Sequence, residues 1–144
     1  MKTKRNATFA ATLFVGIFSL AMVPGAYANS RSCSDATLKG HYSALLNGSV
    51  NGAPFAALDI VISDGNGNIT GTGTVVVNGT PMPTSFTATY TVNPDCSGSF
   101  VSDTGTTEDI TVSRDGSEVQ IILTGTPLGP ATVTGVAKNL NSSD

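Results

Sequence analysis

Apolar and polar side chains alternate along much of the chain after residue 30. The clearest case is 84–92, where serine and threonine alternate with Phe86, Ala88, Tyr90 and Val92. A period of two is typical of a strand with one face on a core and the other in water. Turn formers occupy 93–98 and include Cys96. We therefore expect a strand, a turn and a crosslink to meet here.

Seven further segments have a strand pattern, and short turns separate them. They are 41–47, 55–63, 69–77, 97–102, 108–114, 119–124 and 131–138. Asn, Asp and Gly are dense in the turns, which favours tight hairpins. Residues 34–40 predict one helical turn before the first strand.

This order of elements predicts an all-β fold, since no window shows a convincing helical period. We expect an eight-stranded antiparallel up-and-down barrel with a short N-terminal helical turn. A two-sheet sandwich is the alternative, but sandwiches usually need at least one longer crossing connection. Closing the sheet into a barrel also removes both of its edges.

The predicted strand 55–63 is almost entirely apolar, and Asp59 interrupts one of its two faces. We expect Ala56, Leu58, Ile60 and Ile62 to face the interior, which turns Asp59 outward into solvent or an ion pair. The alternative is a buried Asp59 with a raised pKa, a feature often found at functional sites.

Several apolar residues fall on the face opposite the predicted core. They are Phe55, Val61, Val76 and Ile122. If they cluster, they predict a homo-oligomer or a partner surface; scattered singly, they need no explanation.

The N-terminal 28 residues have the pattern of a secretory signal peptide. A basic start precedes an apolar run over 7–23, and the small-x-small sequence 26–28 ends the segment. The alternative, a membrane anchor, is disfavoured because the run is short and a Pro-Gly pair follows it. We expect export to the periplasm or the extracellular space, no stable membrane insertion, and a single domain over 29–144.

Charge limits the classes of partner that we expect, and cysteine content indicates the cellular compartment. Acidic residues outnumber basic ones by ten to seven over the whole chain, and no basic cluster follows the N-terminal segment, so nucleic acid is not an expected partner.

The two cysteines, Cys33 and Cys96, form an even pair in an exported chain, and we expect a disulfide between them. Closing this loop contributes about 4 kcal/mol on the chain-entropy model.

No motif for catalysis, metal or cofactor binding rises above background. The run 64–68, Asp-Gly-Asn-Gly-Asn, is similar to the start of a calcium loop but lacks its later glycine and glutamate, so a hairpin turn is preferred. His41 is the one histidine, and a hydrolytic triad with Ser43 and Asp59 is the alternative to a solvated strand-end residue. Threonines at alternate positions in three strands suit a solvated face or, alternatively, an ice-binding array.

Three groups of residues resemble a family of small exported bacterial proteins of uncharacterised role. They are Cys33 with Leu38-x-Gly40-x-Tyr42, the segment 64–71, and Thr89–Cys96 with Gly98. The barrel of that family is similar to allene oxide cyclase and, more loosely, to the lipocalins. The resemblance implies export and a barrel, and it carries no catalytic residue onto this chain.

We therefore predict a non-enzymatic exported barrel that binds a small apolar ligand inside. The predicted lining is Tyr42, Leu58, Ile60, Phe86, Tyr90, Phe100 and Ile121. One alternative is a structural or surface-interaction protein with a filled core. The other is an enzyme like the allene oxide cyclases. An internal cavity of several hundred cubic ångströms would disfavour the filled core.

Overall fold

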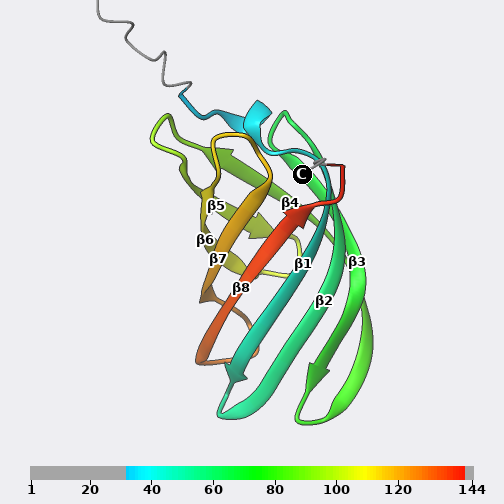
Figure 1. Cartoon of the computed structure of the whole chain (residues 1–144). Helices are drawn as coiled ribbons and strands as arrows, with labels where there is room; N and C mark the ends of the chain where they lie inside the picture. Colours follow the sequence, from blue (N-terminus) through cyan, green and yellow to red (C-terminus); the bar gives the residue numbers. More distant parts are fainter. Residues whose placement is uncertain (1–31, 142–144) are drawn as a thin grey trace, which may run out of the picture.

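The computed structural model describes residues 32–141, and these form a closed antiparallel barrel of eight strands in sequence order (Figure 1). A short 3-10 turn, η1, precedes the barrel at Asp35–Thr37. The strands are β1 (Lys39–Val50), β2 (Ala53–Asp64), β3 (Asn68–Val77), β4 (Thr80–Val92), β5 (Ser97–Ser102), β6 (Thr107–Val112), β7 (Glu118–Gly125) and β8 (Ala131–Asn139). The predicted fold class, strand number and N-terminal helical turn are confirmed.

Two Asn-Gly pairs make tighter hairpins than the sequence pattern indicated. Asn51 and Gly52 join β1 to β2, and both have positive φ angles, of 51° and 79°. Asn78 and Gly79 join β3 to β4 with φ angles of 49° and 79°. Positive φ at both central residues is the requirement of the type I′ turn, whose twist matches that of paired strands. As a result β1 extends to Val50 and β4 begins at Thr80, within stretches that looked like longer turns.

The strands differ in length, which makes one side of the barrel taller than the other. Figure 1 shows the β1–β2 and β3–β4 hairpins reaching past the shorter β5 and β6. Pairing between β4 and β5 covers only Ala88–Val92, so the first half of β4 has no strand on its β5 side. The Thr87 carbonyl accepts a hydrogen bond from the Asp103 backbone N–H on that side. Pro83 and Pro81 lie four and six residues before Thr87, so their backbone groups face the same edge. Proline has no N–H to offer a further strand, which suits it to a free edge.

The sheet closes between β1 and β8, in a register that runs from Tyr42 opposite Asn139 to Val50 opposite Ala131. One end of the barrel is covered by η1, and we call it the η1 end. The Cys33–Cys96 disulfide lies there, as predicted, and joins cysteines with a sequence separation of 63. The Val92 backbone N–H also donates to the Asp35 carboxylate at 2.7 Å. These links hold η1 across the end of the core.

The expected facing of β2 is wrong. Leu58, Ile60 and Ile62 point outward and are 56%, 44% and 44% exposed, whereas Asp59 is buried with 7% of its surface accessible. The reason is register: β1 places Tyr42 and Ala44 in the core, and they pair with Val61 and Asp59. Paired residues lie on the same face of a sheet, so the odd-numbered residues of β2 must face inward.

The predicted outward apolar set is also partly wrong. Phe55 and Val61 lie on the inner face of β2 and pack against the core, whereas Ile122 is exposed as expected. Other exposed apolar side chains adjoin one another across the outer wall, since Leu45 of β1 pairs with Leu58 of β2 and with Val136 of β8.

The predicted signal peptide, 1–28, lies outside the described residues. Within 32–141, no helix has the length and apolar character that a membrane crossing demands.

Replacing both cysteines in the variant Cys33→Ser/Cys96→Ser should lower the free energy of unfolding by about 4 kcal/mol, because the reduced chain regains the entropy of an open loop. Urea denaturation followed by circular dichroism measures the change. The wild-type protein treated with a reductant is the control and should lose the same amount. A loss below about 1 kcal/mol in both samples would contradict a stabilising role for this bridge.

Candidate functional site

The barrel encloses a cavity of about 320 Å³. Its wall is mainly aliphatic and aromatic; Leu46, Val75, Phe86, Phe100, Ile121 and Leu123 contribute to it. Leu38 and Tyr42 line it at the η1 end, and the 2.9 Å hydrogen bond that the Tyr42 hydroxyl donates to the Gly116 carbonyl ties the barrel wall to the β6–β7 turn there.

The opposite end of the cavity reaches the protein surface. Its lining includes the exposed residues Thr104 of the β5–β6 connection and Pro127 and Leu128 of the β7–β8 connection. We call this the loop end. Thr84 and Phe86, from the half of β4 that lacks a β5 partner, line the same region. The short β5 and β6 therefore leave an entrance beside the taller wall.

Asp59 projects into this apolar cavity from β2. Its Oδ1 atom is buried and has no hydrogen-bond partner in the described part of the chain. Burial raises the pKa of this carboxyl above its ordinary value. The residue opposite it on β3 is Gly73, where an added Cβ would lie 2.2 Å from Asp59 Oδ1. The absence of a side chain at Gly73 thus provides the space for the Asp59 carboxyl group.

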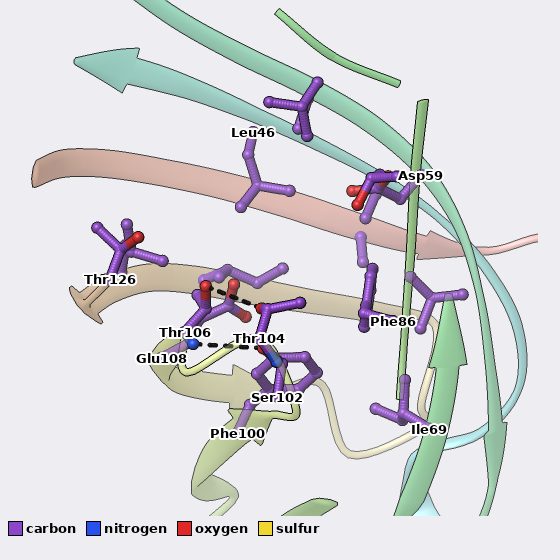
Figure 2. Close-up of a pocket in the computed structure, with 18 of the residues that line it drawn as sticks. Leu46, Asp59, Ile69, Phe86, Phe100, Ser102, Thr104, Thr106, Glu108 and Thr126 are labelled. Carbon is purple, nitrogen blue, oxygen red and sulfur yellow. Dashed lines mark hydrogen bonds between the residues drawn. The ribbon is translucent and has the colours of Figure 1, made fainter. Parts of the chain in front are cut away.

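Glu108 projects into the cavity from β6, on the wall opposite β2 in the strand order (Figure 2). Burial, and secondarily the negative charge of Asp59, raise the pKa of the Glu108 carboxyl from 4.5 to about 7. Apart from Asp59, Glu108 and Tyr42, the lining residues carry no side chain that titrates. Two acidic groups therefore share an apolar cavity whose described lining contains no lysine, arginine or histidine.

Hydroxyl groups surround Glu108 near the loop end. Ser102, Thr104 and Thr106 all line the cavity, as Figure 2 shows. The Ser102 oxygen accepts hydrogen bonds from the backbone N–H groups of Thr104 and Thr106, at 3.2 and 3.3 Å, and it is also bonded to the Thr104 hydroxyl. These bonds organise the connection between β5 and β6 and leave a small polar rim beside the entrance.

Four of the seven predicted lining residues do line the cavity: Tyr42, Phe86, Phe100 and Ile121. Leu58 and Ile60 do not, because they lie on the outer face of β2. Tyr90 is buried at the η1 end instead, outside the cavity lining. Its hydroxyl lies 2.9 Å from the Asp35 carbonyl oxygen and 2.9 Å from the Ser63 hydroxyl, so it helps to hold η1 in place.

The residues of the hypothetical hydrolytic triad and of the calcium-like loop are not arranged as those sites require. His41 is exposed while Asp59 faces the interior, so the residues of the hypothetical triad lie on opposite faces of the wall. Asp64 accepts hydrogen bonds from the backbone N–H of Asn66 and from both the backbone and the side chain of Asn68, at 2.7 to 3.1 Å. Its carboxylate is therefore occupied in closing the hairpin. Within 32–141, no cluster of three or more His, Cys, Asp or Glu side chains is suited to a metal ion.

Asp59 and Glu108 were not among the predicted lining residues, although the sequence contained a signal for the inward position of each. Glu108 precedes Ile110 and Val112 at the same two-residue spacing, so the alternation that buries those residues also turns Glu108 inward. For Asp59 the signal was the Asn51-Gly52 pair. A two-residue turn there pairs Ala44 with Asp59 and reverses the expected face of β2.

Comparisons of this chain with protein-family models, with curated proteins and with solved structures found no match.

The partly buried Glu108 should make the protein less stable as the pH rises. Its folded pKa of about 7 exceeds the ordinary 4.5, so the stability associated with its proton is complete below pH 4.5 and is lost as the pH passes 7. Glu108→Gln should match the wild type at pH 4 and exceed its unfolding free energy by roughly 3 kcal/mol at pH 8.5. Urea titrations at the two pH values measure this difference.

Asp109→Asn is the matched control for that experiment, because Asp109 is the exposed neighbour of Glu108 on β6. It removes the same charge from the outer face, and we expect a change within about 0.5 kcal/mol at either pH. Equal pH profiles for Glu108→Gln and the wild type would contradict a partly buried Glu108 without a charge partner.

Proposed function

We propose that this protein is an exported barrel that binds a small, largely apolar ligand in its interior. The observation that carries the proposal is the cavity of about 320 Å³ inside the barrel. Ligand pockets are concave, mostly apolar, and furnished with a few polar groups that orient the ligand. The lining has this composition, because Phe86 and Phe100 contribute aromatic surface and Asp59 and Glu108 contribute polar groups.

The position of the cavity also supports binding. One end is covered by η1 and the disulfide, whereas the other is bordered by exposed connections and by the unpaired half of β4. A ligand can enter at the loop end without opening the barrel. The filled-core alternative requires that side chains occupy this space, and the cavity of about 320 Å³ does not support it.

Export is the second part of the proposal. The Cys33–Cys96 disulfide fits an oxidising compartment, because such bonds persist outside the cytosol. The N-terminal basic and apolar pattern over 1–28 agrees with a secretory signal peptide. Together they support a periplasmic or extracellular location.

Ligand binding can be tested with N-phenyl-1-naphthylamine, a probe that fluoresces in apolar surroundings and whose nitrogen is uncharged at neutral pH. The wild-type protein should bind it saturably, one probe per chain. Ala57→Phe should abolish the fluorescence increase, because Ala57 is buried and lines the cavity, and a phenyl ring there fills the space. Ala44→Leu, at another lining position, provides a second variant if Ala57→Phe does not fold.

Ala56→Phe is the matched control, since Ala56 neighbours Ala57 but does not line the cavity. It should bind the probe as the wild type does. Circular dichroism shows whether each variant is folded. Absence of saturable binding to the wild type, or equal binding by folded Ala57→Phe and Ala56→Phe, would overturn the proposal.

One observation favours a second candidate function, that of an enzyme like the allene oxide cyclases. The pKa of Glu108, about 7, is suited to a group that takes up and releases protons at neutral pH. An enzyme of this kind would convert the compound that it binds. Chromatography of a co-purifying compound before and after incubation with fresh protein distinguishes turnover from simple binding, because a cyclisation changes the retention time but not the molecular mass.

A further inference from the structure

The cavity contains two acidic groups and no basic group that could neutralise them. Asp59 and Glu108 come from opposite walls, β2 and β6. Neither forms an ion pair among the described residues, whereas Lys138 and Glu118 pair on the outer surface. Burying an ionised carboxylate without a partner is costly, and proteins normally supply one. No such partner lies among residues 32–141, so a bound ligand would have to supply it when these carboxyl groups are ionised.

The Asp59 carboxyl group is the strongest indication that a ligand supplies it. Only 7% of the residue is accessible, and among residues 32–141 its Oδ1 atom has no donor within hydrogen-bond distance. Such orphaned acceptors are rare in folded proteins and call for an explanation. Gly73 leaves room for this carboxyl on the inner wall, which an alanine would obstruct. A hydrogen-bond donor in the cavity would satisfy it.

We propose that the ligand of this barrel is an organic amine, with an ammonium group held between Asp59 and Glu108 and an apolar body against the surrounding walls. The inference rests on the proposed ligand-binding function and specifies the chemical class of the ligand. An ammonium group provides a positive charge and several N–H donors for two carboxylates. The aliphatic and aromatic lining, including Leu46, Phe86 and Phe100, receives the rest of the molecule.

Other ligand classes fit this arrangement less well. A carboxylic acid such as a fatty acid would bring a third negative charge beside Asp59 and Glu108. A bare metal ion would find only two carboxylate side chains, in a wall that is otherwise mostly apolar. A neutral alcohol can donate one hydrogen bond but leaves both charges uncompensated. The negative net charge of the chain, −3, also favours the approach of a cation.

The pH dependence of binding follows from the groups that face the cavity. Asp59 and Glu108 are its acidic groups, and Tyr42 is the other titratable lining residue, with its hydroxyl already donating to the Gly116 carbonyl. An alkylammonium ion keeps its charge up to about pH 10. Its affinity should therefore rise between pH 5.5 and pH 8.5, as Glu108 loses its proton. A neutral ligand gains nothing from that ionisation.

The experiment compares decylamine, decanol and decanoate, which share one chain length, as competitors of N-phenyl-1-naphthylamine at concentrations below micelle formation. At pH 8.5 decylamine should bind wild-type protein about tenfold or more tightly than decanol, and decanoate should bind least, because charge-assisted hydrogen bonds are the stronger ones. Asp59→Asn and Glu108→Gln should each reduce this preference for the amine about tenfold while still binding the probe. Asp109→Asn, which removes an exposed charge from the same strand as Glu108, should retain it.

The outcomes separate this inference from the proposed function. If the probe binds but decylamine and decanol compete equally, or if the preference survives in both Asp59→Asn and Glu108→Gln, the amine inference is wrong and the ligand-binding barrel stands. A preference that is equally large at pH 5.5 would also overturn it. If the probe does not bind to the wild type at all, the proposed function fails first.

Discussion

The register between β1 and β2 is the constraint on which the interior of this barrel depends. The two-residue turn at Asn51 and Gly52 sets it, and from there Ala44 is paired with Asp59 along the ladder. Cross-strand partners share a face, so the buried side of β1 determines the buried side of β2. The pairing of β1 with β8 then closes the sheet, which leaves the β2 side chains no other interior to occupy.

This constraint places a carboxyl group in a cavity where the surroundings do not favour its charge. Asp59 and Glu108 each have a pKa above the ordinary value because both are removed from water, and their proximity adds repulsion to Glu108. Such an arrangement reduces stability above neutral pH. The disulfide offsets part of this cost by restricting the unfolded chain. Functional sites commonly combine local destabilisation with stability supplied elsewhere.

The unequal strand lengths connect the fold to its proposed use. If all eight strands were as long as β1 and β4, the wall would continue past the entrance beside Thr84 and Phe86. The six-residue strands β5 and β6 end earlier and leave the unpaired half of β4 beside the opening. Pro81 and Pro83 then reduce the tendency of that free edge to pair with another chain. An accessible cavity and a protected edge therefore arise from the same feature.

The sequence by itself determined the strand number, the positions of most turns, the antiparallel barrel and the single disulfide. These depend on local alternation, on turn-forming residues and on the presence of only two cysteines. Alternation was sufficient for Phe86, which lines the cavity, because its neighbours Ser85 and Thr87 are polar. In β2 both faces carry apolar residues, so composition did not distinguish Leu58, which is exposed, from Ala57, which is buried.

Only the tertiary structure decided that Asp59 and Glu108 share one cavity. They belong to strands on opposite walls, and they meet because the sheet curls until β8 pairs with β1. The same closure left Tyr90 at the η1 end, where it bonds to backbone carbonyl groups instead of lining the cavity. A pattern along one strand specifies two faces, whereas the choice of inner face and the neighbours across the interior depend on pairing with other strands.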